Sequence, residues 1–247
     1  MKRLFLILAF LFYGSLNAQA PAAVPIPQEP HHHLVLENDY VRVFRVSVPA
    51  HDATLLHQHD VPYVYVSLGP ADVINAVQGK PEARIVMTDG QVGYSPGNFA
   101  HIARNESDMD FNNVTIELLK PQGEPRNLCA QIIPGAASAG CDKALGSALS
   151  GHGFSVESQL QTDQWNLDLV RLGPGTISPK LVVRGKSLVV TLSGSEAQID
   201  VVGKPAQALH GGEATWIEAR GYISNPSNKP SICLQLAFAD RGGHTKP

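Results

Sequence analysis

The sequence predicts an all-β protein made of two antiparallel β-barrels in series. Short apolar runs rich in β-branched and aromatic residues alternate with turn signals such as Gly69-Pro70 and Asp89-Gly90 along most of the chain. No amphipathic pattern extends beyond about three helical turns, and Asp142–Leu149 is a candidate for a short helix. The stretch Val41–Pro49 resembles Trp165–Gly173 at an offset of 124 residues, which indicates that one unit occurs twice.

The composition fits one large all-β domain or two ordinary domains. The chain has 247 residues, of which 43% are hydrophobic and only 17% charged, with 22 glycines and 18 prolines. This balance excludes a disordered chain. The formal charge of -3 argues against a nucleic-acid partner, because nucleic acid requires a concentrated basic face.

The first 20 residues have the pattern of an export signal. Lys2 and Arg3 precede the apolar stretch Leu4–Tyr13, and Ala18-Gln19-Ala20 is a small-x-small cleavage site. An uncleaved anchor is the alternative. No later stretch approaches the roughly 20 apolar residues of a membrane span. We therefore expect a periplasmic or extracellular protein without a membrane anchor, beginning with a flexible arm over residues 21–32.

Strands are expected in two sets with the same order. The first set is Tyr40–Val48, Leu55–His59, Tyr63–Leu68, Ala83–Met87, Phe99–Ala103 and Asn112–Leu119, in a barrel over residues 33–120. The second set is Ser155–Gln161, Trp165–Leu172, Lys180–Val183, Ser187–Leu192, Gln198–Val202, Ala214–Glu218 and Ile232–Phe238, in a barrel over residues 153–240. Residues 121–152, which include a stretch rich in glycine, alanine and proline, are expected to link the barrels.

Three cysteines suit an exported protein. Cys129 and Cys141 lie in the expected linker and are candidates for a disulfide, with two unpaired thiols as the alternative. Cys233 occurs in a strand pattern and is expected to be a small buried hydrophobic residue.

Three histidines have the spacing of metal ligands. His57 and His59 are two residues apart in an expected strand, so both side chains point to the same face. His101 follows Gly90 and Pro96, which are expected to form the turns around a returning strand. A barrel brings distant strands face to face, so the three imidazoles can meet on one divalent ion. The alternative is three core or surface histidines without a metal.

This arrangement, His57-x-His59 followed by Gly90, Pro96, His101 and Asn105, resembles the two paired motifs of the cupin superfamily. The repeated architecture resembles a bicupin, and the likeness covers about residues 33–119 and 153–239. It implies small barrels related to jelly rolls, usually with a divalent metal inside. The chemistry of that superfamily includes dioxygenation, decarboxylation and isomerisation, and some members have none.

Two positions depart from the superfamily pattern. A glutamate usually follows the second histidine by four or five residues, where this chain has Tyr63 and Val64. A three-histidine site is neutral, so a bound ion would keep its full charge and have open positions. The second motif usually has a glycine two residues after its proline. In this chain Gly97 follows Pro96 directly and Asn98 takes the usual position of the glycine, and a Gly-Asn pair forms a turn as readily.

The second barrel is expected to be free of metal. At an offset of 124 residues, His57 and His59 correspond to Leu181 and Val183, and His101 corresponds to Tyr222 or Ile223. Apolar replacements indicate a packed interior. Such a barrel would cover the first one or form a dimer surface.

Other candidate residues are less specific. Tyr63 and Tyr65 either supply a phenolic hydroxyl near the ion or pack in the barrel, and the sequence leaves both possibilities open. His51 is expected in a turn, with a place at the mouth of the site as the alternative. His31-His32-His33 is expected to precede the first strand, with the binding of stray metal ions as the alternative. Histidine ligands do not discriminate between Fe, Mn, Ni, Cu and Zn.

The first functional hypothesis is a dioxygenase-type metalloenzyme acting on a small oxygen-rich molecule. The second is a non-catalytic module that captures a small ligand or uses the metal for structure. A metal-dependent isomerase or lyase of a sugar or organic acid is the third. The sequence has no nucleophile elbow and no glycine-rich phosphate loop. Exposed barrel edges would allow a homodimer.

Overall fold

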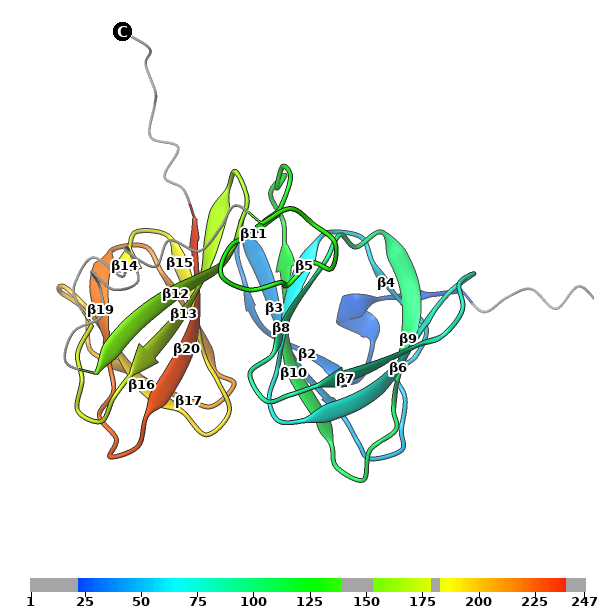
Figure 1. Cartoon of the computed structure of the whole chain (residues 1–247), viewed down its shortest axis with the longest axis horizontal. Coiled ribbons are helices and arrows are strands. Elements are labelled where there is room, and N and C mark those ends of the chain that lie inside the picture. Colours follow the sequence, from blue (N-terminus) through cyan, green and yellow to red (C-terminus); the bar gives the residue numbers. More distant parts are fainter. Residues whose placement is uncertain (1–21, 139–152, 179–182, 239–247) are drawn as a thin grey trace, which may run out of the picture.

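The computed structural model describes residues 22–138, 153–178 and 183–238, which form strands joined by turns and loops (Figure 1). Within these ranges there is no α-helix, and η1 (Ile26–Gln28) is a single 3-10 turn. None of the described residues forms a helix of the length and apolarity needed to span a membrane. The all-β prediction is confirmed. The expected export signal, Cys141 and the candidate helix Asp142–Leu149 lie outside the described residues.

The N-terminal unit consists of two five-stranded sheets. Their strand orders are β1-β4-β9-β6-β7 and β2-β3-β10-β5-β8. All strand pairs are antiparallel except β1 with β4. The strands are β1 (Val24–Pro25), β2 (His32–Glu37), β3 (Val41–Val48), β4 (His57–His59), β5 (Tyr63–Ser67), β6 (Ala71–Val77), β7 (Ala83–Met87), β8 (Val92–Ser95), β9 (Phe99–Asn105) and β10 (Phe111–Leu118).

The C-terminal unit repeats this plan with a six-stranded and a four-stranded sheet. Their orders are β11-β12-β13-β20-β15-β18 and β14-β19-β16-β17. The strands are β11 (Arg126–Asn127), β12 (Phe154–Gln161), β13 (Trp165–Leu172), β14 (Val183–Arg184), β15 (Ser187–Thr191), β16 (Glu196–Val201), β17 (Gln207–His210), β18 (Ala214–Ile217), β19 (Arg220–Ser224) and β20 (Ser231–Phe238). β11 lies in the segment expected to be a linker. The predicted bounds of the two barrels stay predictions.

The N-terminal segment differs from the expected flexible arm. Residues 24–32 form β1, η1 and the start of β2. Ile26 is buried in the apolar core between the two sheets, together with residues such as Phe44 and Val73. The segment is fixed because Glu29 is also buried, with hydrogen bonds to its neighbours.

The register of the short strands defines the counterparts of the repeat. In the N-terminal unit, His101 pairs with His57 on one side and Val77 on the other. In the C-terminal unit, Gly221 occupies the same place, between Val183 and Val201.

Gly221 is therefore the counterpart of His101, and the prediction of Tyr222 or Ile223 was wrong. Likewise Val183, and not Leu181, is the counterpart of His57. The prediction failed because His101 and Gly221 are 120 residues apart, whereas β3 and β13 begin 124 residues apart. A Cβ atom added to Gly221 would lie 2.5 Å from the carbonyl oxygen of Asp200, so this position has no room for a side chain.

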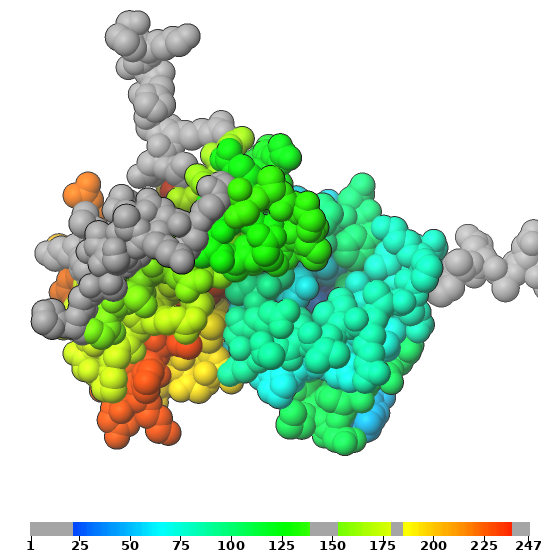
Figure 2. Space-filling model, viewed as in Figure 1, coloured from blue at the N-terminus to red at the C-terminus, as the bar shows by residue number. Residues whose placement is uncertain are grey.

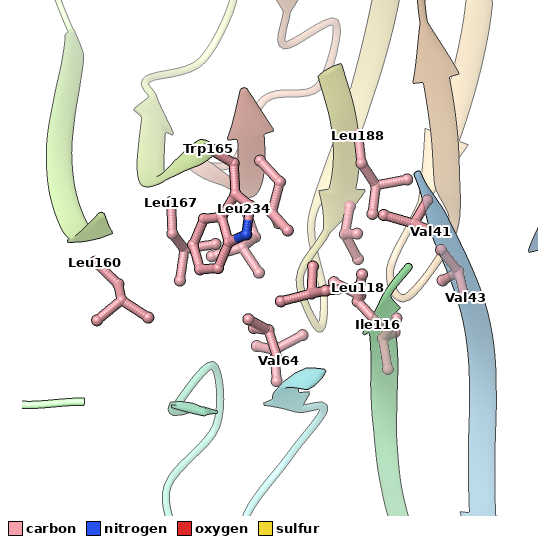
Figure 3. Close-up of a cluster of buried hydrophobic side chains, with 14 of the residues drawn as sticks. Val41, Val43, Val64, Ile116, Leu118, Leu160, Trp165, Leu167, Leu188 and Leu234 are labelled. Carbon is pink, nitrogen blue, oxygen red and sulfur yellow. The ribbon is translucent and has the colours of Figure 1, made fainter. Parts of the chain in front are cut away.

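The largest apolar cluster lies between the two units. It joins Val64, Ile116 and Leu118 of the N-terminal unit to Trp165 and Leu234 of the C-terminal unit (Figure 3). The space-filling view shows the two units in direct contact, with residues 120–138 in green at their junction (Figure 2). Burial of this apolar surface stabilises the two units as one body.

Polar contacts also cross this boundary. The Lys186 ammonium group donates a hydrogen bond of 2.6 Å to the Tyr40 hydroxyl. The Arg45 guanidinium group lies 3.3 Å from the carbonyl oxygen of Gly211. Arg45 fits there because the neighbouring Gly212 lacks a side chain, since an added Cβ atom would overlap the guanidinium group.

Candidate metal centre

The three predicted ligands converge inside the N-terminal unit. β4 alternates buried and half-buried residues, so both His57 and His59 point inward. β9 places His101 directly opposite His57 in the antiparallel register. The ring centroids of His57 and His101 are 4.4 Å apart, and His59 lies 5.0 Å and 5.1 Å from them, respectively. All three side chains are buried.

Hydrogen bonds to Nδ1 orient the rings of His57 and His101 and leave the Nε2 atom of each ring without a hydrogen-bond partner. The Nδ1 atom of His57 lies 2.9 Å from the carbonyl oxygen of Leu55, and that of His101 lies 2.6 Å from Asn75 Oδ1. Each acceptor requires a proton on Nδ1, which leaves Nε2 with a lone pair. The Nε2 atoms of His57 and His101 are buried and have no hydrogen-bond partner. This is the arrangement that a metal ligand needs.

His59 has a buried carboxylate behind it. Its Nδ1 atom lies 3.8 Å from Glu117 Oε1, and Glu117 pairs with the Arg42 guanidinium group at 2.9 Å. Burial raises the pKa of the Glu117 carboxyl to about 6, although Arg42 acts in the opposite direction. The register of β10 places Glu117 opposite both Arg42 and Tyr63, so this carboxylate belongs to the interior of the unit.

A fourth histidine, which the sequence did not predict, lies at the same centre. The ring of His32 is 4.7 Å from that of His57 and 6.2 Å from that of His59. One ligand atom from each of His32, His57 and His59 lies within 4.8 Å of the others, so this group differs from the predicted set by His32 in place of His101. The expectation that His32 only precedes a strand was wrong, because it begins β2 with its side chain buried.

The partner of His32 is the buried carboxylate of Glu29. Glu29 Oε2 lies 2.5 Å from His32 Nδ1, and its carboxylate also accepts hydrogen bonds from the backbone N–H groups of His31 and Leu55. Burial alone would raise the pKa of Glu29, but the side-chain hydrogen bonds with His32 and His31, the charge interaction with His32 and the Leu55 N–H outweigh it and lower the pKa to about 2. The spacing Glu29-x-x-His32 was the available sequence signal, and it is weak.

The ring separations fit a bound transition metal. With a metal–nitrogen bond of about 2.0–2.1 Å, the ring centre lies about 3.2 Å from the ion, so rings at 90° to 109° are about 4.5–5.2 Å apart. The three predicted ligands are 4.4–5.1 Å apart. Two rings on opposite sides of the ion would be about 6.4 Å apart, and His32 and His59 are 6.2 Å apart.

The buried environment keeps these imidazoles neutral. Burial is the main cause that lowers the pKa of His57 to about 4, of His101 to about 3 and of His59 to about 2, and the neighbouring histidines add to it. A metal binds the neutral imidazole, so a ligand set that is neutral at neutral pH is ready for the ion.

No family model and no curated protein matches this sequence. Solved structures do match its fold. AerE from Microcystis aeruginosa superimposes with a TM-score of 0.55 at 10% identity, over 86% of this chain and 99% of AerE. The cupin 2 conserved barrel domain protein from Leptotrichia buccalis gives 0.50 at 9% identity, over 84% and 88% of the two chains.

A substituted variant of salicylate 1,2-dioxygenase from Pseudoaminobacter salicylatoxidans gives a TM-score of 0.52 at 11% identity, over 80% of this chain and 71% of the dioxygenase. The chain has a cupin fold. At these identities the likeness concerns the fold alone, and the site must be judged from its own residues.

The turn before β9 aims His101 in this cupin fold. Gly97 and Asn98 both have positive φ angles, of 68° and 61°. A Cβ atom on Gly97 would lie 2.1 Å from the carbonyl oxygen of Val61, so only glycine fits. The Asn98 N–H donates to the His59 carbonyl oxygen at 2.6 Å, which ties the turn to β4. The expectation that this pair forms a turn is confirmed.

A cavity of about 300 Å³ adjoins the histidines. Aromatic side chains line much of it, among them Tyr63, Tyr65 and Phe99. The Tyr63 ring stacks on His59 with centroids 4.2 Å apart, and burial raises the pKa of its hydroxyl well above its usual value. Lys80 is the sole lysine or arginine among the described lining residues, which include no aspartate or glutamate. The cavity can therefore take a small neutral or anionic molecule.

Proposed function

We propose that this protein is an exported metalloenzyme of the dioxygenase type, acting on a small oxygen-rich molecule. One divalent ion (Fe, Mn, Ni, Cu or Zn) would bind to His57, His59 and His101 in the N-terminal unit. The observation that supports this proposal is the convergence of buried imidazoles beside a cavity, with the Nε2 atoms of His57 and His101 lacking partners. Buried polar atoms without partners are costly, and a metal ion would satisfy them.

The protein residues would hold the ligand set in place before the ion arrives. Leu55 and Asn75 orient the rings of His57 and His101 through their Nδ1 atoms. A bound ion would act as a Lewis acid toward an oxygen donor or activate dioxygen. No carboxylate from the superfamily's usual position takes up a coordination place, because that position is Tyr63.

The walls of the cavity would bind and orient the substrate. Tyr63, Tyr65 and Phe99 offer aromatic surfaces, and the raised pKa values keep both tyrosines as neutral phenols that can donate hydrogen bonds. Burial also excludes bulk water from the histidines. These features suit a small aromatic or apolar molecule that carries oxygen donors.

The C-terminal unit would have no metal and would support the first unit. The supporting observations are Gly221 at the place of His101 and the apolar cluster that joins the two units. Export would place the protein in an oxidising compartment. This suits Cys129, which is disulfide-bonded, and its pairing with Cys141 stays a prediction.

The alternative is a non-catalytic module that binds a metal or a small ligand. Tyr63 at the usual place of the carboxylate ligand favours it, since the site then departs from the superfamily's pattern. This alternative predicts the same metal content and no turnover.

Elemental analysis of protein purified without a polyhistidine tag or chelator tests the metal site. We expect about one equivalent of a transition metal in the wild type and its loss in His57→Ala. His51→Ala is the matched control, since His51 is an exposed turn residue paired with Asp108.

Substrate-dependent oxygen uptake by the Fe(II)-loaded protein then separates enzyme from binder. Diketones, flavonols and thiols are suitable test compounds. Uptake that His57→Ala abolishes and His51→Ala retains would support the enzyme. Full metal occupancy without uptake on any of these compounds would favour the binding module.

A further inference from the structure

The segment before β2 is built into the metal centre. We call residues 24–32 the N-terminal strap. β1 runs parallel to β4, with Val24 opposite His57, and the Val24 N–H donates to the Leu56 carbonyl oxygen at 2.9 Å. Ile26 is 2% exposed and anchors the strap in the core of the N-terminal unit. The strap therefore lies against the strand that carries two of the proposed ligands.

The turn of the strap places Glu29 and His32 together. The Glu29 N–H donates to the Ile26 carbonyl oxygen at 3.1 Å, and the His32 N–H donates to the Glu29 carbonyl oxygen at 3.0 Å. These two backbone bonds fold the chain so that both side chains point to the interior. The side chain of Glu29 is fully buried and that of His32 is 5% exposed. An arm exposed to solvent would not bury a carboxylate and an imidazole in this way.

The hydrogen bond to Glu29 determines which nitrogen His32 presents to the centre. Glu29 Oε2 takes the Nδ1 side of the ring, which leaves Nε2 for another partner. The ring lies 4.7 Å from that of His57, within the range for two imidazoles on one ion. The paired carboxylate and imidazole are the usual support for a histidine that binds a metal.

We propose that His32 is a fourth metal ligand and that Glu29 is the positioning residue that orients it. This proposal rests on the proposed function, because it requires the histidine cluster to bind an ion. It assigns a role to a strap outside the two sequence motifs. It also explains how the site could bind an ion although Tyr63 stands where the superfamily usually has a glutamate ligand. His32 on β2 would supply the fourth ligand, and the negative charge of Glu29 would act on the ion through His32.

A competing interpretation is that Glu29 and His32 form a structural pair only. Such a pair would affect the stability of the metal-free protein and leave the bound ion unchanged. The number of imidazoles on the ion distinguishes the two, because a structural pair does not alter it. A readout of the ion's coordination is therefore needed, besides stability or activity.

The test is a competition titration of Zn²⁺ against a chromophoric chelator, together with the visible spectrum of the Co²⁺-loaded protein. We expect His32→Ala to weaken Zn²⁺ binding by about 100-fold or more and to change the Co²⁺ spectrum. Glu29→Gln should weaken binding by about 10–100-fold, the usual effect of removing a partner behind a ligand. His33→Ala is the matched control, because His33 is exposed on the same strand.

The outcomes separate this proposal from the one on which it rests. Wild-type Zn²⁺ affinity and an unchanged Co²⁺ spectrum in folded His32→Ala, with binding lost in His57→Ala, would overturn the role of His32 alone. Unchanged binding in His57→Ala would overturn both proposals. If His32→Ala does not fold, His32→Gln takes its place, since its amide can still donate to Glu29.

Discussion

Asn105 and Asn225 make the same hydrogen bonds in the two units. The side-chain amide of Asn105 donates to the carbonyl oxygens of Val48, Pro49 and Met109 at 2.8–3.1 Å. That of Asn225 donates to Leu172, Gly173 and Lys229 at 2.7–3.2 Å. Each Oδ1 atom accepts from the backbone and hydroxyl of a serine two residues later. The repeat thus preserves a device that ties a returning strand to the loop at its end.

Removal of either asparagine should destabilise its unit by a similar amount. Asn105→Ala would remove the amide hydrogen bonds to three carbonyl oxygens and the acceptor of the Ser107 backbone and hydroxyl, and we expect a loss of about 2–4 kcal/mol in the free energy of unfolding. Asn225→Ala should cost about the same. Asn105→Asp should be no better, because a carboxylate cannot donate to carbonyl oxygens.

Urea unfolding followed by circular dichroism measures this effect. Asn166→Ala, an exposed asparagine of β13, is the control and should change stability by less than about 0.5 kcal/mol. A loss below 1 kcal/mol for both Asn105→Ala and Asn225→Ala would contradict the proposed role of the two amides.

Much of the fold was predictable because local pattern and tertiary context agree. β7 and β13 have the predicted bounds, since β-branched and apolar residues fill both strands between clear turn signals. β6 and β19 were missed, because Asp72, Asn75 and Gly221 weaken the strand pattern. Hydrogen bonds to neighbouring strands nevertheless hold the backbones of β6 and β19 in the sheet, and these tertiary contacts cannot be read from a local sequence pattern.

The candidate site was predictable only where its spacing is local. His57 and His59 share a strand face through the two-residue period, and the second motif indicated His101. His32 was missed because its place depends on the parallel pairing of β1 with β4 and on the burial of Glu29, both of which are tertiary. Because His31, His32 and His33 are consecutive, the sequence pattern does not indicate which of the three side chains points to the interior.

The metal-free protein should lose stability as the pH falls below neutral. In the unfolded chain the three histidines take up protons near pH 6.5, whereas in the fold burial lowers their pKa values to about 4, 2 and 3. The unfolded state therefore binds more protons between pH 6.5 and about 4, and stability drops there by up to about 1.4 kcal/mol per pH unit for each histidine.

Glu117 acts in the opposite direction over part of this range. Its raised pKa, about 6, means that the folded state binds its proton first between pH 6 and 4.5, which offsets the effect of one histidine. Urea unfolding of the protein in EDTA at pH 7, 6 and 5 gives the net slope. The slope should flatten in His57→Gln, and a pH-independent stability of the wild type would refute the prediction.

The ligand set should discriminate sharply between classes of metal. Imidazole nitrogens suit Fe, Ni, Cu and Zn, whereas Mg²⁺ and Ca²⁺ require oxygen ligands, which the four histidines lack. Zn²⁺ or Ni²⁺ at 100 times its Kd should stabilise the fold by about 2.7 kcal/mol. Millimolar Mg²⁺ should have no effect.

Thermal unfolding with each ion is the measurement, and His57→Ala provides the blank. Ions that bind at the surface raise the Tm of the wild type and of this variant alike, so only the difference between them counts. An equal rise with Mg²⁺ and Zn²⁺ would be inconsistent with a histidine site.

The two units should unfold together, because their largest apolar cluster is shared. Ile116 and Leu234 are fully buried in it from opposite sides of the boundary (Figure 3). We expect Ile116→Ala to cost about 2–5 kcal/mol, since the cavity left behind cannot collapse completely. When one unit unfolds, the apolar face of the other unit becomes exposed to water. The substitution should therefore destabilise both units.

The two tryptophans allow a direct measurement of this coupling. Trp165 and Trp216 belong to the C-terminal unit and lie in or against the shared cluster, so tryptophan fluorescence reports on that unit and on its contact with the other, in which Ile116 lies on β10. In urea, Ile116→Ala should shift the fluorescence transition to lower concentration by the same amount as the transition followed by circular dichroism. Val86→Ala, at an exposed position of β7, should shift neither. A fluorescence transition that stays in place while the circular dichroism divides into two steps would mean that the units unfold independently, despite the cluster between them.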